Sequence, residues 1–259
     1  SLSPRTVKAL VRHLQWLYGV RVKVEGAHHL LTTPSPYVIV SNHQSSIDFI
    51  GLMECLPDRC APIAKRELLF VGPFGAIAWL CGVFFIDRQR TQHAKHTMGA
   101  VASVMRERGI NVWVFPEGTR SHGAPMLPFK KGAFHLAVQA QVPIIPVVFS
   151  SYSRFYSRQE RRFTPGVVVA RVLSPVATDG FTSDTVPALT ESVRLTMIEV
   201  FQQTSLVVSS PSPPSPHSPP HSPPHSPPPH SPPHSPPPHS PPPASPPDAE
   251  READGKKQR

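Results

Sequence analysis

The sequence predicts an α/β protein: a layered domain with a central mixed sheet flanked by helices, followed by a disordered C-terminal tail. Two observations lead to this prediction. Short β-branched and apolar runs alternate with helical patterns over residues 20–205, the element order of layered α/β domains. The 35 prolines are unevenly spread, because 21 of them lie between Pro211 and Pro247 among serines and histidines. A segment of that composition cannot bury enough apolar surface to fold.

The first expected element is an amphipathic helix over residues 6–18. Five apolar residues recur at helical spacing on one face, Val7, Leu10, Val11, Leu14 and Leu17. Such a stripe fits a helix packed on the protein's own core, and it equally fits an interfacial helix lying on a membrane. The chain begins at Ser1 and shows no signal peptide, so we expect residues 1–19 to be preceded by a missing segment.

The other elements follow in alternation and define the domain boundaries. Apolar and β-branched runs predict strands at 20–25, 37–40, 83–86, 112–115, 144–149 and 167–172. Helical spacing predicts helices near 47–55, 91–108, 132–141 and 186–203. We therefore expect one folded domain over residues 20–205 and a Pro/Ser/His-rich tail with a charged end over 206–259.

Residues 68–86 carry no charge and approach the length of about 20 residues that spans a bilayer. Glycines and Pro73 interrupt this segment, and polar motifs lie on both sides of it in the sequence. A bilayer crossing would separate those motifs, which fit a single site. We therefore expect a buried or membrane-dipping helix followed by a core strand.

Charge and cysteine content narrow the class of protein. The formal net charge is +9, which favours a polyanionic partner such as nucleic acid, anionic lipid or a phosphorylated small molecule. No nucleic-acid motif is present. The three cysteines, Cys55, Cys60 and Cys81, contain no CxxC pair. They indicate neither a disulfide framework nor a zinc site, and they favour a reducing compartment.

Three polar motifs each follow a predicted strand. The first, at 42–48, contains His43 and Asp48. A histidine can remove a proton from a hydroxyl while a nearby carboxylate fixes its tautomer. The other two, at 86–90 and 115–121, offer Arg88 and Arg120 as anion-binding groups. Because open α/β sheets bind ligands beyond the carboxyl ends of their strands, we expect these motifs to form one site.

The sequence also resembles a known family. NHQSSID (42–48), GVFFIDR (82–88), FPEGTR (115–120) and VPIIP (142–146) are similar, in order and spacing, to the four motif blocks of the glycerolipid acyltransferases. Longer runs such as CAPIAKRELLF and SSYSRFYSRQERRFT resemble the animal members that act on lysophosphatidic acid. The resemblance covers about residues 7–203 and excludes the tail.

The resemblance implies acyl-CoA-dependent acylation of the sn-2 hydroxyl of lysophosphatidic acid, giving phosphatidic acid, at the endoplasmic reticulum membrane. It implies that His43 is the general base and that Asp48 orients it. It implies that Arg88 clamps the acceptor phosphate, and that the phosphate is positioned by Glu117, Gly118, Thr119 and Arg120. Pro143 and Pro146 would have acyl-donor or structural roles. We expect no metal and no cofactor, because acyl-CoA is a co-substrate. We also expect no nucleic-acid partner.

Two alternatives remain open at this point. A related acyltransferase could use glycerol 3-phosphate or another lysophospholipid as acceptor. A non-catalytic adaptor could instead present the proline-rich tail, whose partners the sequence does not identify. The basic stretch at 154–162 could bind anionic headgroups or simply be solvated.

Overall fold

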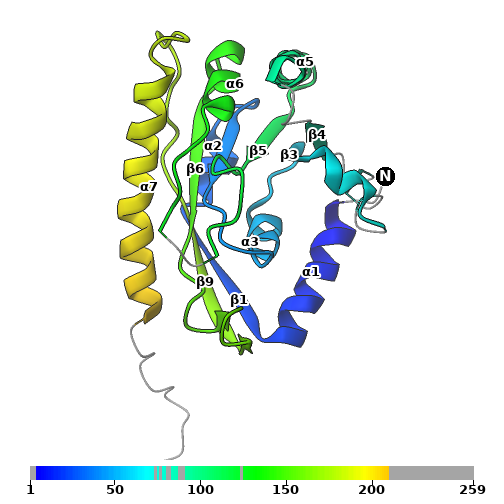
Figure 1. Ribbon diagram of the computed structural model, residues 1–259, viewed down its shortest axis with the longest axis vertical. Helices are drawn as coiled ribbons and strands as arrows, with labels where there is room; N and C mark the ends of the chain where they lie inside the picture. The colour runs from blue at the N-terminus through cyan, green and yellow to red at the C-terminus, as the bar shows by residue number, and fades with distance from the viewer. Residues whose placement is uncertain are drawn as a thin grey trace, which may run out of the picture. The chain divides into compact units, whose positions relative to one another are not determined.

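The computed structural model describes residues 4–72, 75, 78, 79, 83–86, 91–122 and 125–209. Its helices are α1 (Pro4–Tyr18), α2 (His28–Thr32), α3 (Asp48–Cys55), the 3-10 helix η1 (Arg66–Phe70), α5 (Thr91–Arg108), α6 (Gly132–Ala140) and α7 (Val186–Ser209). Its strands are β1 (Val20–Glu25), β2 (Val38–Ser41), β3 (Cys60–Lys65), β4 (Phe84–Ile86), β5 (Asn111–Val114), β6 (Ile144–Phe149), β7 (Tyr156–Ser157), β8 (Arg162–Phe163) and β9 (Gly166–Val172) (Figure 1).

Seven strands form one mixed sheet in the order β1-β9-β6-β2-β5-β3-β4. The strands from β6 to β4 are mutually parallel, whereas β9 runs antiparallel to β6 and parallel to β1. The carboxyl ends of β2, β4, β5 and β6 therefore lie at one edge of the sheet. β7 and β8 form a separate antiparallel hairpin.

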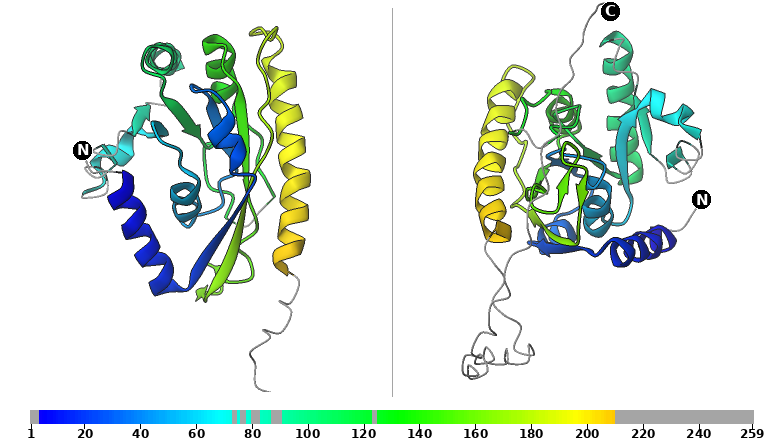
Figure 2. Two further views of the ribbon diagram at one scale, coloured as in Figure 1. Left: turned by 180° about the vertical axis from the view of Figure 1, so that it is seen from behind. Right: turned by 60° about the horizontal axis from the view of Figure 1, so that its bottom comes forward.

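Helices cover both faces of the sheet, and alternating side chains along each strand build two cores. Val38 and Val40 of β2 pack in the core under α5, α6 and α7, while Ile39 points into the core under α1 and α3. Both views in Figure 2 show α1 and α7 on opposite sides of the sheet. The expected layered α/β fold with a mixed sheet is thus confirmed.

Most predicted elements are present within a residue or two of their expected bounds. The sequence analysis missed β3, α2 and the β7–β8 hairpin. α7 runs to Ser209, past the domain boundary expected at residue 205. The residues of the predicted tail from 210 to 259, including Pro211–Pro247, lie outside the described residues.

The structure describes residues 68–72, 75, 78, 79 and 83–86 of the segment expected as a buried or membrane-dipping helix followed by a core strand. Its described start is the 3-10 helix η1, in which no residue is buried, so the buried alternative does not hold for residues 68–70, whereas the membrane-dipping alternative stays a prediction. Phe70, Val71 and Trp79 are 75%, 53% and 64% exposed. The expected strand is present as β4, the outermost strand of the sheet next to β3. Among the helices in the described ranges, none has both the length and the apolar character that a bilayer crossing requires.

Candidate active site

His43 and Asp48 form a hydrogen-bonded pair at the carboxyl end of β2. His43 Nδ1 lies 2.6 Å from Asp48 Oδ2, and the imidazole stacks on the Phe115 ring with centroids 4.2 Å apart. The Asp48 side chain is 1% exposed, whereas that of His43 is 25% exposed. A buried acceptor on Nδ1 fixes the tautomer in which Nε2 carries no proton, so Nε2 is available as a base.

Asp48 also closes the loop that carries His43. Its Oδ2 accepts hydrogen bonds from the backbone N–H groups of Gln44 (2.7 Å) and Ser45 (3.1 Å). The carboxylate lies at the first residue of α3, where the helix dipole favours negative charge. One carboxylate thus holds both the loop and the histidine in place.

Two amide side chains anchor this loop to the neighbouring strand β6. Asn42 accepts from Phe149 N–H through Oδ1 (2.8 Å) and donates to Phe149 C=O through Nδ2 (2.9 Å). Gln44 Nε2 lies 3.0 Å from the carbonyl oxygen of Ser150, to which it donates. Asn42 and Gln44 are 2% and 6% exposed, so these buried bonds fix the start of the motif rigidly.

Glu117, from the loop after β5, is joined to the same backbone. Its Oε1 accepts from the His43 N–H (2.6 Å) and its Oε2 accepts from the Leu127 N–H (2.9 Å). Burial raises the pKa of Glu117, although the two N–H donors oppose that shift. Both carboxylate oxygens are therefore committed to the main chain, and the residue is only 3% exposed.

The other residues of the motif at 115–121 reach the surface beside His43. Gly118 has a φ of 72°, a left-handed conformation that favours glycine. The exposed Arg120 donates from Nη1 to the Ser46 hydroxyl at 2.8 Å. Ser121 N–H donates to the His43 carbonyl at 2.8 Å. The motifs at 42–48 and 115–121 therefore lie together, as the sequence led us to expect.

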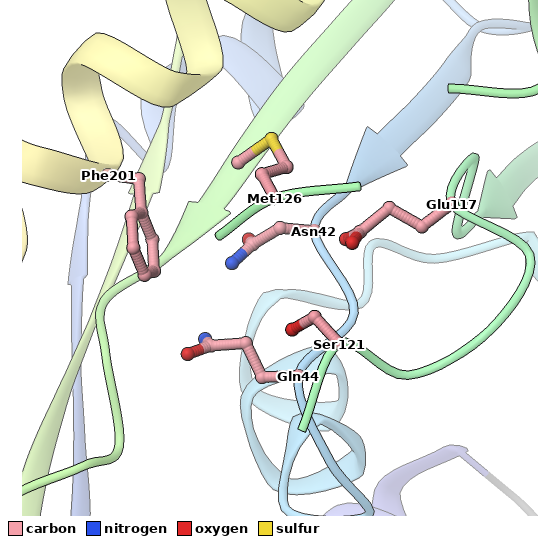
Figure 3. A pocket seen from close by; sticks show the side chains of 6 residues that line it. All are labelled: Asn42, Gln44, Glu117, Ser121, Met126 and Phe201. Atoms are coloured by element: carbon pink, nitrogen blue, oxygen red, sulfur yellow. The ribbon is translucent and has the colours of Figure 1, made fainter. Parts of the chain in front are cut away.

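A narrow gap, too small to hold a water molecule, lies between side chains of these two motifs and their neighbours. Figure 3 shows Phe201 of α7 and Met126 on its apolar side, facing the polar groups of Asn42 and Glu117. Its lining residues are Asn42, Gln44, Glu117, Ser121, Met126 and Phe201. Phe201 therefore brings α7 next to the polar groups of the two motifs.

The remaining expected site residues are placed differently. Arg88 follows the end of β4 by two residues in sequence. It lies outside the described residues, as do the other residues of 87–90. Pro143 directly precedes β6 and Pro146 is its third residue, away from the carboxyl ends that carry His43 and Glu117. Pro143 C=O accepts from Val38 N–H and Pro146 C=O accepts from Leu173 N–H, which are contacts of the sheet itself.

Tyr152 is a side chain at this edge that the sequence analysis did not single out. It is 3% exposed and comes three residues after β6, whose carboxyl end lies beside that of β2. The rule that located the other motifs, a polar group just beyond a parallel strand, applies to it as well. Within the described ranges, no group of three or more His, Cys, Asp or Glu side chains could hold a metal ion.

Comparisons with known proteins agree with this geometry. Residues 21–150 match the family model described as Acyltransferase. The 1-acyl-sn-glycerol-3-phosphate acyltransferase alpha of Mus musculus is 58% identical over 202 residues, which are 78% of this chain and 70% of that protein. The protein of the same name from Homo sapiens is 57% identical over 78% of this chain and 71% of its own.

A solved structure shows the same fold. The crystal structure of the 1-acyl-sn-glycerophosphate (LPA) acyltransferase PlsC from Thermotoga maritima has a TM-score of 0.63 to this chain at 24% identity. The match covers 77% of this chain and 78% of that one.

Proposed function

The chain belongs to the acyltransferase family that includes the 1-acyl-sn-glycerol-3-phosphate acyltransferases, and from that premise we propose that it acylates lysophosphatidic acid to phosphatidic acid. The observation that supports this activity best is the His43–Asp48 pair, in which the buried carboxylate engages Nδ1 of a histidine whose side chain is 25% exposed. The acyl donor is acyl-CoA, a co-substrate, and no metal or further cofactor enters the proposal.

In the proposed reaction, His43 Nε2 removes the proton from the sn-2 hydroxyl as its oxygen attacks the thioester carbonyl carbon. The new C–O bond gives a tetrahedral intermediate, and the Asp48 carboxylate stabilises the imidazolium formed at the same time. Collapse of the intermediate breaks the C–S bond, and the imidazolium returns its proton to the departing CoA sulfur. Because the acceptor hydroxyl is itself the nucleophile, no enzyme serine or cysteine is needed.

Cationic side chains near this base would hold the acceptor phosphate. We propose that Arg88 clamps the phosphate, because it follows β4 in sequence and β4 ends at the same sheet edge as β2. Arg120 is exposed and bonded to Ser46 within the His43 loop, and Gly118 and Thr119 precede it. A guanidinium can pair with two phosphate oxygens at once.

The acceptor is tested by measuring thiol release from palmitoyl-CoA. We expect release that depends on lysophosphatidic acid, with kcat/KM at least about tenfold lower for glycerol 3-phosphate and for lysophosphatidylcholine. The first lacks the acyl chain, and the second masks the phosphate with a choline group. A preference for either of these acceptors would contradict the proposed substrate in favour of the alternative acceptors.

We also propose that the protein works at a membrane surface, that of the endoplasmic reticulum. Phe70 and Trp79 present large apolar side chains to solvent, and this segment and α1 lie on the side of the sheet away from α7 (Figures 1 and 2). The net charge of +9 would add attraction to anionic headgroups. Both substrates carry long apolar chains that partition into such a surface.

Vesicle flotation tests this membrane surface. Replacing both Phe70 and Trp79 with serine should weaken binding to phosphatidylcholine vesicles containing phosphatidic acid by at least about tenfold, because each buried large side chain contributes about 1.5–3 kcal/mol. The matched control replaces Leu195 and Leu206, which are similarly exposed on α7, with serine. Equal loss of binding in both double variants would reject this face as the membrane contact.

A further inference from the structure

Two buried side-chain oxygen atoms in the described part of the chain have no hydrogen-bond partner, and both belong to residues at the His43 site. They are Oδ1 of Asp48 and the hydroxyl of Tyr152. Leaving a buried polar atom unpaired is costly, and such atoms are rare in folded proteins. The second oxygen of Asp48, in contrast, already accepts from Gln44 and Ser45 and contacts His43.

The fold explains why these two residues are neighbours. β6 and β2 are adjacent and parallel, so the chain leaving β6 passes the loop that leaves β2. Ser150 is fixed to β9 by reciprocal bonds with Val169, its N–H donating to the Val169 carbonyl and its hydroxyl accepting from the Val169 N–H. Ser151 N–H donates to the Ser205 hydroxyl of α7 at 2.9 Å. The backbone before Tyr152 is therefore held on two sides.

The backbone after Tyr152 is held as well, and its ring is packed. The Tyr152 carbonyl accepts from the N–H groups of Phe155 (3.1 Å) and Tyr156 (2.9 Å). The ring lies in the core that contains Ile47 and Leu52, which flank Asp48 in sequence. Burial, and after it the nearby charge of Asp48, raises the pKa of Tyr152 well above its usual value. The hydroxyl therefore stays protonated and can donate.

We propose that Tyr152 is a positioning residue for acyl transfer, whose hydroxyl donates to Oδ1 of Asp48 and holds that carboxylate against His43. The charge of Asp48 acts on the Tyr152 hydroxyl, and both the hydroxyl and Oδ1 are buried without another partner, so each can take the other as its hydrogen-bond partner. Tyr152 then acts on the reaction only through Asp48. This inference rests on the proposed function, since it assigns a role within that reaction.

The expected consequence is a change in how His43 ionises during turnover. With the hydroxyl removed, the negative charge of Asp48 is less dispersed and the imidazolium is favoured. The other titratable groups around the pair are Glu117 from the loop after β5 and Cys55 from α3, with Arg120 at the rim. All three are retained in a Tyr152→Phe variant, which loses one oxygen atom and keeps the ring that fills the core.

The experiment measures kcat, KM and the pH profile of lysophosphatidic-acid-dependent thiol release for the wild type and Tyr152→Phe. We expect kcat to fall about tenfold, the size associated with a charge-assisted hydrogen bond, with both KM values within about twofold. The acidic limb of the kcat profile should move to higher pH. In an Asp48→Asn background, Tyr152→Phe should have little further effect, because the two residues then act as one unit.

The matched control is Tyr37→Phe. Tyr37 is equally buried, and its hydroxyl donates to the Leu30 carbonyl (2.8 Å) away from the site, so this variant reports the cost of losing a buried tyrosine hydroxyl. It should lower the Tm and leave kcat and the pH profile unchanged. A wild-type enzyme without acceptor-dependent thiol release would contradict the proposed function itself. An active wild type with an equally active Tyr152→Phe, or full additivity with Asp48→Asn, would overturn the role of Tyr152 alone.

Discussion

Replacing His43 with alanine is expected to lower kcat for acyl transfer by about 10²–10⁴-fold, the usual contribution of a general base. Without the imidazole, Asp48 cannot take over as the base, because its side chain is 1% exposed and its Oδ2 accepts from backbone N–H groups. The fold should persist, since Asp48 Oδ2 keeps its bonds to the Gln44 and Ser45 N–H groups. Those bonds keep one oxygen of the buried carboxylate paired after the substitution.

Acceptor-dependent thiol release at saturating substrates checks this result, together with the Tm of each variant. His28→Ala serves as the control, because His28 is an exposed residue of α2. Substantial residual turnover by His43→Ala at an unchanged Tm would remove His43 from the role of base. A large fall in Tm would instead place its contribution in folding.

The fold was predictable where strands are apolar on both faces. β6 and β5 are buried along their whole length, and their β-branched residues mark them as strands. Strand β3 could not be predicted in this way, because its sequence CAPIAK contains Pro62, and a proline argues against a strand interior. In the structure, Pro62 lies where β3 changes partner: residues 60–62 pair with β5 and residues 63–65 with β4. The interruption in pairing tolerates the missing N–H, and sequence alone does not show it.

The sequence predicted which motifs form the site, but it did not predict the contacts between their side chains. Parallel strands bring 42–48 and 115–121 to one edge, and the spacing of His43 and Asp48 within one loop suggested their pairing. Glu117 lies 74 residues from His43 in sequence and Tyr152 lies 104 residues from Asp48, so no local pattern reports that the fold brings these residues to the pair. Glu117 was expected among the residues that position the phosphate, whereas its two oxygens are engaged by the N–H groups of His43 and Leu127.

Glu117→Gln is expected to lower kcat about tenfold to a hundredfold with little change in KM for lysophosphatidic acid. Glutamine has the same shape but only one acceptor oxygen, so its NH₂ group must face one of the two backbone N–H donors. An unpaired buried N–H costs about 1–3 kcal/mol, and the strain falls on the main chain of His43. A displacement of about 1 Å in a catalytic group can reduce the rate by about a hundredfold.

The division between kcat and KM separates this role from a direct contact with the acceptor. A side chain that binds the phosphate equally in the ground and transition states affects KM, whereas one that aligns the base affects kcat. A carboxylate beside a phosphate would also repel it, so neutralising Glu117 in a binding role should improve acceptor affinity. Steady-state kinetics of Glu117→Gln, beside the exposed-glutamate control Glu107→Gln, therefore decide the matter. A lower KM with an unchanged kcat would show that Glu117 faces the acceptor, against the backbone contacts that place it behind His43.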